Sequence, residues 1–430
     1  MQNWEQLLSL NKLGDKQKRL RKDDYPTRSA FEVDYDRIIF STAFRRLQDK
    51  TQVIPLSKTD FVHTRLTHSL ETSVVGRSLG REIGHHILAN QPQLQHQHHY
   101  SIADFGAIIA AACLTHDIGN PPFGHSGEKA IGEYFQYGNG LRFKDELPKE
   151  VYQDLIDFEG NANGFKLLVD KNAMGMPLRT TTATLGAFLK YPKPSLPKKP
   201  SSHVTDKKFN FFTQQKEQFE ELVQHLGLLP RNKEENRYYR HPLAYLVEAA
   251  DDICYTIIDL EDATNLGWID EDKSLELLQP FIKDQFSQKV YKNISRKNER
   301  LSYLRALSIG GLINEAKKQF IDHEKQIMNG EMSQPLLASS ALSPALDKII
   351  DHSVKYIYQS KEVTQKEIAG YQILNELLDF FTHAIEQINN SRATNFDELI
   401  ARTFLKDVSY KDKKTSDWLI NCCSFVASLT

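Results

Sequence analysis

The sequence predicts an all-α protein, and two observations carry this prediction. Apolar residues recur at helical spacing in residues 34–47, 66–88, 241–263 and 368–388, whereas segments with the alternating pattern of strands are few and short. Residues 101–117 are apolar nearly all round, which is typical of a helix buried at the centre of a fold. We therefore expect helices throughout, arranged around one central apolar helix.

Composition narrows the class of protein. The chain has 430 residues, 40% hydrophobic and 26% charged, which is usual for a globular protein with one large domain or two smaller ones. Its net charge of -2 means that nucleic-acid binding would need a local basic patch. The first residues lack the pattern of a signal peptide, and the apolar run 105–114 is too short for a membrane span. We expect a cytoplasmic protein without membrane contact.

The four cysteines indicate a reducing compartment. They form no CxxC pair, so a disulfide framework or a thiolate zinc site is not expected. We predict buried or incidental thiols at Cys113, Cys254, Cys422 and Cys423.

Two polar segments are predicted to be loops. Residues 190–208 contain four prolines and many lysines, and proline cannot continue a helix. We expect a solvated, disordered insertion there; the alternative is a basic surface for phosphates or single-stranded DNA. The histidine cluster at 95–100 is expected to be a surface loop between helices and not a metal site.

The segment 114–128, LTHDIGNPPFGHSGE, is the first that suggests chemistry. Adjacent residues of a regular helix point about 100° apart, so His116 and Asp117 can face one metal only where a helix ends. The sequence supplies such an end, because Gly119 permits unusual dihedral angles and Pro121–Pro122 stop a helix. An imidazole and a carboxylate form half of a metal site, so further ligands must come from elsewhere.

Two distant residues are candidates for these ligands. His68 begins an amphipathic helix, whose predicted apolar face consists of Leu66, Leu70, Val74 and Leu79. Asp251, Tyr255 and Asp259 follow one another at i, i+4 and i+8 along an otherwise apolar helix. Such a polar stripe either faces solvent or lines a polar cavity. Taken singly, each of these residues is more often an ordinary core or surface residue than a ligand.

Taken together, these residues resemble a known pattern. The order His…His-Asp…Asp on separate helices is similar to the HD-domain metal-dependent phosphohydrolases. Closer resemblance, to the bacterial deoxyguanosine triphosphate triphosphohydrolase group, lies in the motifs FRRLQDKTQV, HTRLTHSLE, THDIGNPPFGHSGE, FEGNANGF and EAADDICYTIIDLEDA, between about residues 36 and 265. The later EIAGY, near residue 367, also looks familial.

The resemblance implies a fold, an activity and an assembly. The fold would be an all-α HD domain with appended C-terminal helices, and the assembly a homo-oligomer, expected to be a hexamer. The activity would be hydrolysis of a deoxynucleoside triphosphate, with dGTP expected, to a deoxynucleoside and intact triphosphate, which controls dNTP pools. We expect an N-terminal helical arm at 1–35 and an HD catalytic domain at 36–275. A helical region at 276–430 would complete the pocket and form oligomer contacts.

The resemblance also implies roles for single residues. The metal ligands would be His68, His116, Asp117 and Asp251. Two imidazoles and two carboxylates suit Mg, Mn, Fe or Co. Asp251 is preferred to Asp252 because the ligand in the HD pattern directly follows the alanine, and because Asp251 shares a helix face with Tyr255. Asp252 would instead cap or pair with a basic residue.

His125 and Glu128 match catalytic positions beside the α-phosphate. Water or His125 would attack the phosphorus, with Glu128 orienting the imidazole, and the sequence leaves the nucleophile open. Asn120 stands where some relatives place another histidine, so the proton relay is also left open. The Arg45–Arg46 pair is predicted to be structural or part of an interface.

Substrate contacts follow by the same resemblance. Gln52 and Asp259 would meet the sugar 3′-hydroxyl, and Tyr255 would pack under the deoxyribose, where a 2′-hydroxyl would not fit. The phosphate candidates are Arg65 and, more weakly, Lys190; Asn161 would lie near the reacting centre.

Two other functions remain open at this stage. One keeps the HD site but acts on another nucleotide, as a 5′-nucleotidase or a cyclic-dinucleotide phosphodiesterase. The other is a regulator that binds single-stranded nucleic acid and retains a residual site. An allosteric dNTP or single-stranded DNA could also act as an effector of the enzyme.

Overall fold

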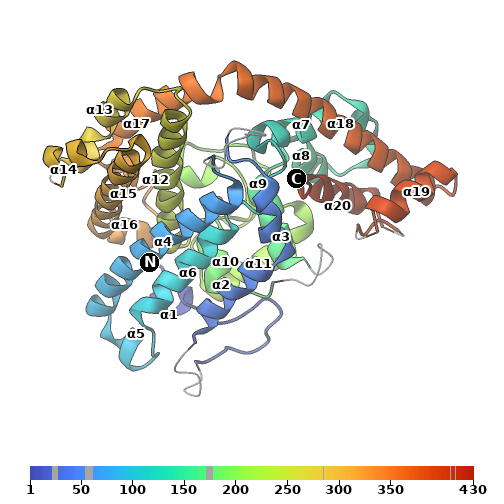
Figure 1. The fold of residues 1–430 in the computed structure, drawn as a ribbon. Coiled ribbons are helices and arrows are strands. Elements are labelled where there is room, and N and C mark those ends of the chain that lie inside the picture. The colour runs from blue at the N-terminus through green and yellow to red at the C-terminus, as the bar shows by residue number, and fades with distance from the viewer. Residues whose placement is uncertain (22–27, 54–61, 171–177, 284, 407, 412) are drawn as a thin grey trace.

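The computed structural model describes residues 1–21, 28–53, 62–170, 178–283, 285–406, 408–411 and 413–430. Helices dominate these residues, and their one sheet is a small antiparallel pair of strands, β1 (Pro230–Asn232) and β2 (Arg237–Tyr238) (Figure 1). The all-α prediction is confirmed. No helix among the described residues is long and apolar enough to cross a membrane.

The helices follow one another in three stretches of the chain. The first stretch contains α1 (Trp4–Leu7), α2 (Ala30–Phe40), α3 (Thr42–Arg45), η1 (Arg46–Asp49), α4 (Arg65–Asn90), α5 (Pro92–His96), α6 (Ile102–Thr115) and α7 (Gly124–Gln136). The second contains η2 (Asn139–Glu146), α8 (Lys149–Ile156), α9 (Gly160–Val169), α10 (Thr182–Phe188), η3 (Val204–Asp206), η4 (Thr213–Gln215), α11 (Lys216–Leu226) and α12 (Pro242–Asn265). The third contains α13 (Glu271–Ile282), α14 (Gln288–Asn293), α15 (Lys297–Asp322), α16 (Glu324–Asn329), η5 (Leu337–Ser339), α17 (Ser343–Ser353), η6 (Val354–Tyr358), α18 (Lys361–Asn389), α19 (Asn395–Phe404) and α20 (Thr415–Ala427).

Helix α6 is the central helix that the sequence predicts. All of its residues from Asp104 to Thr115 are buried, and it packs against α2, α4, α10 and α12. Burial on every side explains why this helix is apolar all round. It ends directly before His116, so the fold delivers this histidine to the interior.

The predicted apolar face of α4 is wrong in part. Leu79 is fully buried, but Leu70 and Val74 are 38% and 53% exposed. The face that packs on α6 is instead rich in small and polar residues, among them Ser73, Gly76 and Gly80. Small side chains are favoured there because α4 and α6 approach each other closely. A hydrophobicity pattern identifies large apolar residues, so it does not identify this face.

The proline- and lysine-rich segment is also not the solvated insertion that we expected. Tyr191, Lys193 and Ser195 are buried, and the Lys193 ammonium donates to the carbonyl of Pro194. Asp206, at its far end, lies 2.7 Å from a guanidinium nitrogen of Arg231. Prolines prevent a helix but do not prevent packing, so the segment is an ordered wall of the molecule.

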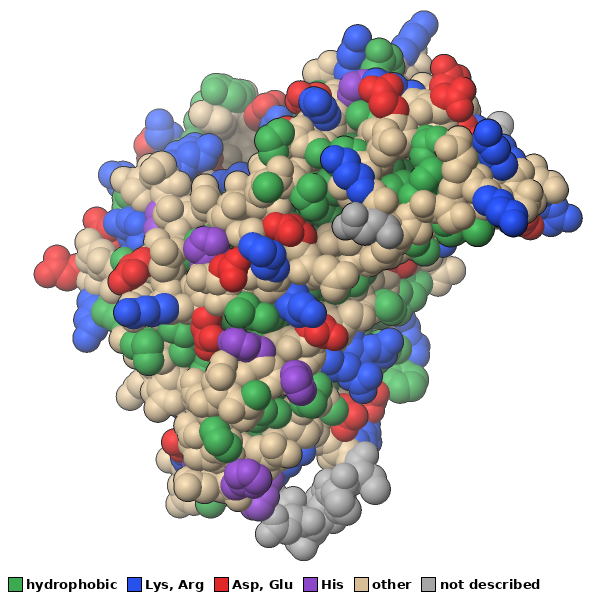
Figure 2. Space-filling model, turned by 90° about the vertical axis from the view of Figure 1, so that its left-hand side faces the viewer, with side chains coloured by type: hydrophobic (Ala, Val, Ile, Leu, Met, Phe, Trp, Pro, Cys, Tyr) green, Lys and Arg blue, Asp and Glu red, His purple; other side chains and the backbone are tan. Residues whose placement is uncertain are grey.

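Two other expectations about side chains are met. The four cysteines are buried and free. The histidine cluster at 95–100 lies at the end of α5, where His96 and His99 are exposed. Charges of both signs are interspersed over the face of the molecule seen in Figure 2, as the near-neutral net charge suggests.

Buried apolar side chains form two clusters. The larger contains residues of α4, α6, α12 and α15, and the smaller contains residues of α7, α8, α18 and α20. Helix α7 contributes Ala130, Ile131 and Phe135 to the smaller cluster, while its first turn carries His125 and Glu128. The placement of these two polar residues therefore depends on the C-terminal helices.

Candidate active site

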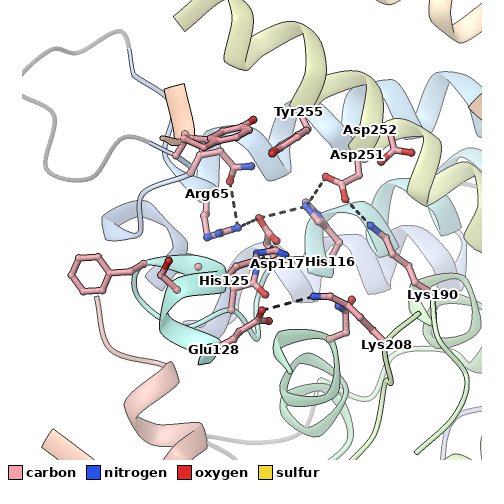
Figure 3. A pocket seen from close by; sticks show the side chains of 18 of the residues that line it. Arg65, His116, Asp117, His125, Glu128, Lys190, Lys208, Asp251, Asp252 and Tyr255 are labelled. Carbon is pink, nitrogen blue, oxygen red and sulfur yellow. Dashed lines mark hydrogen bonds and ion pairs between the residues drawn. The ribbon is translucent and has the colours of Figure 1, made fainter. Parts of the chain in front are cut away.

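One cavity of about 720 Å³ collects most of the predicted site residues (Figure 3). The predicted residues that line it are Gln52, Arg65, His116, Asp117, His125, Glu128, Asn161, Lys190, Asp251 and Tyr255. The C-terminal region adds Pro335, Tyr358, Val363 and Glu367. Residues scattered over more than 300 positions of the chain thus share one space.

The turn after α6 brings His116 and Asp117 into this cavity. His116 is the first residue beyond α6, so the two neighbours sit at the helix end, as the sequence predicts. We expected Gly119 to adopt dihedral angles that other residues rarely adopt, but its backbone φ is not in the positive region. A Cβ on Gly119 would lie 2.1 Å from the carbonyl oxygen of Gly160 and from the backbone nitrogen of Gly164. Glycine is required here because the turn touches the backbone of α9.

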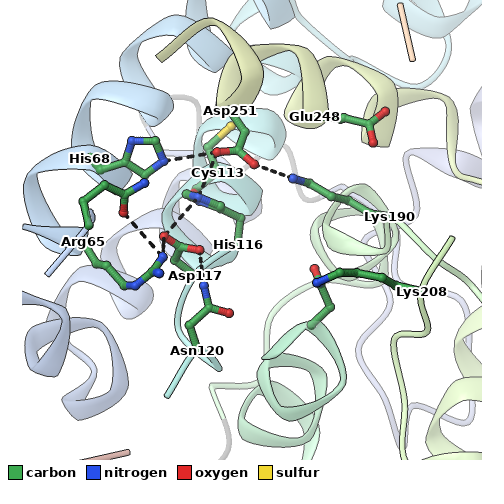
Figure 4. Close-up of polar contacts among 12 residues, drawn as sticks. Arg65, His68, Cys113, His116, Asp117, Asn120, Lys190, Lys208, Glu248 and Asp251 are labelled. Carbon is green, nitrogen blue, oxygen red and sulfur yellow. Dashed lines mark hydrogen bonds and ion pairs between the residues drawn. The ribbon is translucent and has the colours of Figure 1, made fainter. Parts of the chain in front are cut away.

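Three of the four predicted metal ligands form a compact cluster. Ligand atoms of His68, His116 and Asp251 all lie within 4.8 Å of one another. The Nε2 atoms of His68 and His116 lie 3.1 Å and 3.3 Å from Oδ1 of Asp251 (Figure 4). The histidines come from α4 and the end of α6, and the aspartate comes from α12.

The orientation of His116 tests whether a metal fits this cluster. Its Nδ1 lies 2.6 Å from the carbonyl oxygen of Cys113, so Nδ1 carries the proton and donates it. With Nδ1 engaged in this way, only Nε2 can serve as a metal donor; it is buried, has no hydrogen-bond partner among the described residues, and faces Asp251. An orphaned imidazole nitrogen beside a second imidazole and a carboxylate is a fitting donor set for a divalent ion.

Asp117, the fourth predicted ligand, is held from two sides. Its Oδ2 accepts from Arg65 and its Oδ1 accepts from the amide of Asn120, each at 2.5 Å. Oδ2 also lies 3.5 Å from Nε2 of His116. Burial opposes ionisation of Asp117, but the charges of Arg65, His116 and His68 outweigh it and hold its pKa well below the usual range. Its role as a ligand stays a prediction.

Lys190 contacts the same cluster from the opposite side. Its ammonium lies 2.6 Å from Oδ2 of Asp251, the oxygen that the histidines do not approach. Burial opposes the charge of Asp251, yet Lys190 and His116 keep its pKa far below the usual value. Asp252 also lines the cavity; burial and the neighbouring carboxylates of Glu248 and Asp251 raise its pKa to about 7.

His125 and Glu128 do not form the hydrogen bond that we expected. In the part of the chain that the structure describes, Oε1 of Glu128 accepts from the backbone N–H of Gly160 at 2.7 Å, and Oε2 lies 3.8 Å from the ammonium of Lys208. Glu128 therefore fixes the start of α9. The ring of His125 is open to the cavity, and its protein surroundings and the charges of Lys208 and Arg65 lower its pKa to about 4.

Two lysines of the cavity were missed in the sequence. Lys207 and Lys208 lie at the end of the 190–208 segment and line the cavity. Figure 3 shows the side chain of Lys208 pointing toward Glu128. Lys208 lies 2.9 Å from Oε1 of Glu159, whose pKa burial and the charge of Glu128 raise to about 7. The lysine content of the segment was the available signal, and we gave more weight to a solvated loop.

Of the two sugar contacts predicted on α12, only one lines the cavity. Tyr255 lines the cavity, but Asp259 is 4% exposed and does not. Between them stands Tyr358, whose hydroxyl donates to Oδ2 of Asp259 at 2.6 Å and whose ring stacks on Tyr255 at 5.7 Å between centroids. Tyr358 was not predicted. It ends the π-helical turn η6, and π-turns are frequent at functional sites.

The remaining predicted residues border the cavity through defined contacts. Gln52 accepts from Arg65 at 3.4 Å, and Asn161 donates its amide to Glu159 at 2.7 Å. Ser126 donates to Glu367 at 2.8 Å, which joins α7 to α18 at the rim. Sequence reasoning noted a familial motif at Glu367 without giving this residue a role.

Comparison with known proteins identifies the family of this chain. A family model described as HD domain matches residues 65–154. A "Deoxyguanosinetriphosphate triphosphohydrolase-like protein" of Synechocystis is 42% identical over 396 residues, which cover 89% of this chain and 87% of that protein. A protein of the same description from Pseudomonas aeruginosa is 39% identical, over 89% and 85% of the two chains. A "Deoxyguanosinetriphosphate triphosphohydrolase" of Yersinia pseudotuberculosis is 33% identical, over 84% and 78%. The chain belongs to the deoxyguanosinetriphosphate triphosphohydrolase-like family of HD-domain proteins.

Proposed function

We propose that this protein hydrolyses deoxynucleoside triphosphates, with dGTP as the expected substrate, to the deoxynucleoside and intact triphosphate. The observation that carries the proposal is the orphaned Nε2 of His116, which lies between the carboxylates of Asp251 and Asp117 in a cavity rich in cationic side chains. A donor set for a divalent ion and a binding surface for phosphates thus occupy the same space.

We infer that His68, His116, Asp117 and Asp251 hold a divalent ion, and that Mg, Mn, Fe and Co all suit this donor set. When bound, such an ion neutralises charge that develops on phosphate oxygens during transfer. The ammonium of Lys190 already offsets the negative charge of Asp251, so the ion is not the only positive charge beside this carboxylate.

The triphosphate chain is proposed to lie along the cationic wall. Arg65, Lys190, Lys207 and Lys208 all line the cavity. Guanidinium and ammonium groups in a partly enclosed space bind phosphate strongly, because the charges are little screened there. Arg65 is next to Asp117, so its guanidinium belongs at the α-phosphate.

His125 is proposed to act on the α-phosphorus or on the water that attacks it. Its lowered pKa keeps the ring neutral at physiological pH, so a lone pair is available for either role. In the water route, His125 takes the proton of the attacking water as the new P–O bond forms. The bond from phosphorus to the 5′-oxygen breaks, and that oxygen takes up a proton to give the deoxynucleoside.

Selection of the nucleoside is proposed to come from other residues that line the cavity. The ring of Tyr255 leaves no room for a 2′-hydroxyl if the sugar packs against it, and Gln52 can bond the 3′-hydroxyl. Glu367 offers a carboxylate, an acceptor that suits the N1–H and N2–H₂ donors of guanine. This acceptor favours dGTP over dATP, dCTP and dTTP.

We infer a cytoplasmic homo-oligomer, expected to be a hexamer, that lowers dNTP pools and responds to an effector dNTP or to single-stranded DNA. A nucleic-acid-binding regulator is a weaker alternative, because Lys190, Lys193 and Lys208 of the basic segment turn inward or into the cavity.

The direct test is product analysis. The purified protein is incubated with each dNTP and NTP in Mg²⁺ or Mn²⁺, and the phosphorus products are separated. We expect inorganic triphosphate and deoxynucleoside, formed fastest from dGTP. Orthophosphate or pyrophosphate as the first product would exclude a triphosphohydrolase.

A further inference from the structure

A buried lysine lies against the turn that carries His116 and Asp117. Lys50 follows η1 and is 3% exposed. Its ammonium donates to two main-chain carbonyl oxygens, those of Asn120 and Ala427, each at 2.7 Å. In the described part of the chain, no carboxylate lies within ion-pair distance of it. Removing an ammonium group from water is costly, so these two carbonyls are what retains it.

The two carbonyls belong to different elements: the turn after α6 and the end of α20. Asn120 closes the turn that carries His116 and Asp117. Ala427 ends α20, and the last carbonyls of a helix lack partners within the helix and favour a cation. Lys50 thus ties the C-terminal helix to the metal-binding turn.

Both carboxylate oxygens of Asp117 are held by residues that Lys50 holds. Oδ1 accepts from the side chain of Asn120, whose own carbonyl oxygen accepts from Lys50. Oδ2 accepts from Arg65, whose backbone N–H donates to the carbonyl of Lys50 at 2.9 Å. Figure 4 shows Arg65 and Asn120 reaching Asp117 from two sides. Lys50 is the common support of the two contacts.

The end of the chain is fixed at the same place. Arg46, four residues before Lys50, donates to the carbonyl oxygen of Ser428 at 3.2 Å and to its hydroxyl at 2.6 Å. Ser428 is buried, and Figure 1 shows the C-terminus at the inner end of α20 and not at the outer end of α19. Residues 427 and 428 therefore pack against the segment that contains Arg46 and Lys50.

We propose that Lys50 is a positioning residue of the metal site: its ammonium and its carbonyl hold Asn120 and Arg65, and through them the carboxylate of Asp117, against the C-terminal end of α20. The inference rests on the proposed role of Asp117 as a metal ligand. It makes the C-terminal residues 427 and 428 a working part of the active site.

The test is Mn²⁺ binding by the full-length Lys50→Met protein. Methionine keeps most of the apolar stem and removes the ammonium. We expect the Mn²⁺ dissociation constant to rise by about 10–100-fold, as when a partner of a metal ligand is lost. Excess Mn²⁺ should restore most of kcat, with little change in KM for dGTP, because the phosphate and sugar contacts remain.

The matched control is Lys166→Met. Lys166 is also buried, at 2% exposure, and its ammonium pairs with Asp170 at 2.6 Å, outside the cavity. This variant should lose thermal stability but bind Mn²⁺ as the wild type does. Equal weakening of Mn²⁺ binding in both variants would show that Lys50 acts only through general stability.

A second pair of variants removes the C-terminal partner of Lys50 instead of Lys50 itself. This pair also provides the test if Lys50→Met does not fold. A chain ending at Val426 lacks the Ala427 carbonyl and Ser428, whereas a chain ending at Leu429 keeps both. We expect the shorter chain alone to bind Mn²⁺ more weakly, and its combination with Lys50→Met to add little further loss.

The outcomes separate this inference from the proposed function. If the wild type binds no Mn²⁺, the metal-dependent function fails and the inference fails with it. If the wild type binds Mn²⁺, and Lys50→Met and the shorter chain bind it equally well, only the positioning role is wrong.

Discussion

The protonation state of single residues in this site depends on the charges around them. His125 illustrates this, since its ring is open to the cavity but has Lys208 and Arg65 nearby. Desolvation by the surrounding protein, and then the positive charges of Lys208 and Arg65, disfavour the protonated ring and lower its pKa to about 4. The residue is therefore neutral over the whole physiological range, as a base or a nucleophile must be.

Replacing His125 by alanine should lower kcat by about 10²–10⁴-fold, the usual contribution of general acid–base catalysis. Metal content and dGTP affinity should change little, because the imidazole is not part of the metal cluster. Steady-state kinetics, metal analysis and calorimetry with dGTP measure these quantities. In the wild type, the acid limb of kcat/KM that belongs to this group should lie near pH 4. A variant that loses its metal, or keeps most of its kcat, would remove His125 from the mechanism.

Replacing Tyr255 by alanine should narrow the difference in kcat/KM between dGTP and GTP. The ring is proposed to pack against the sugar, so its loss should weaken the deoxy substrate and make room for a 2′-hydroxyl. Tyr358→Phe is the matched control, because it keeps the stacked ring and removes the hydroxyl that donates to Asp259. An unchanged dGTP:GTP ratio in Tyr255→Ala would place the sugar elsewhere.

At the scale of elements, the site depends on close packing between the turn after α6 and helix α9. The turn after α6 touches α9 at Gly119, where a Cβ would meet backbone atoms at 2.1 Å. Asn163 of α9 strengthens this contact by donating its amide to the carbonyl of Gly119 at 2.8 Å. Both oxygens of Asp117 and the Nε2 of His116 depend on where this turn lies.

Gly119→Ala should therefore force the turn away from α9. We expect a loss of stability of about 1–3 kcal/mol, typical of an overpacked interior, together with weaker metal binding. Gly310→Ala is the control: Gly310 lies inside α15 with open space at its Cβ, and alanine there should be neutral or stabilising by about 0.5–1 kcal/mol. Chemical denaturation of both variants provides the comparison. Equal stability of Gly119→Ala and wild type would show that the turn can yield.

Helical spacing identified α4, α12 and α18, and an apolar run identified α6. Ordered motifs found the residues around the cavity. All of these are local properties of a sequence. The inward face of α4 was missed because small residues pack it. Tyr358 and Lys208 were missed because their approach to the cavity depends on long-range packing, which no local pattern records.

At the scale of the whole molecule, stability should fall as the pH falls from about 6.5 to about 4. His241 is fully buried, and its Nδ1 accepts from the backbone N–H of Leu243 while its Nε2 faces the carbonyl oxygen of Leu7. Burial lowers its pKa from 6.5 to about 4. The unfolded chain takes up this proton first, so acid favours unfolding in that interval, by roughly 3 kcal/mol at most.

Other groups titrate in the same interval, so the contribution of His241 is isolated by comparing variants. His241→Gln removes the titrating ring, and His96→Gln removes an exposed one. Thermal unfolding between pH 4 and 7.5 should show a shallower loss of Tm in His241→Gln, while His96→Gln follows the wild type. Parallel curves for all three proteins would contradict the role given to His241.

The most direct test of the central claim follows one oxygen atom. dGTP is hydrolysed by the wild-type protein in H₂¹⁸O with Mn²⁺, and the products are examined by ³¹P NMR and mass spectrometry. Because the metal cluster, Arg65 and His125 share the cavity, we predict attack at the α-phosphorus. One ¹⁸O should appear in intact inorganic triphosphate and none in deoxyguanosine. Label in the deoxyguanosine hydroxyl, or primary release of orthophosphate or pyrophosphate, would contradict the account.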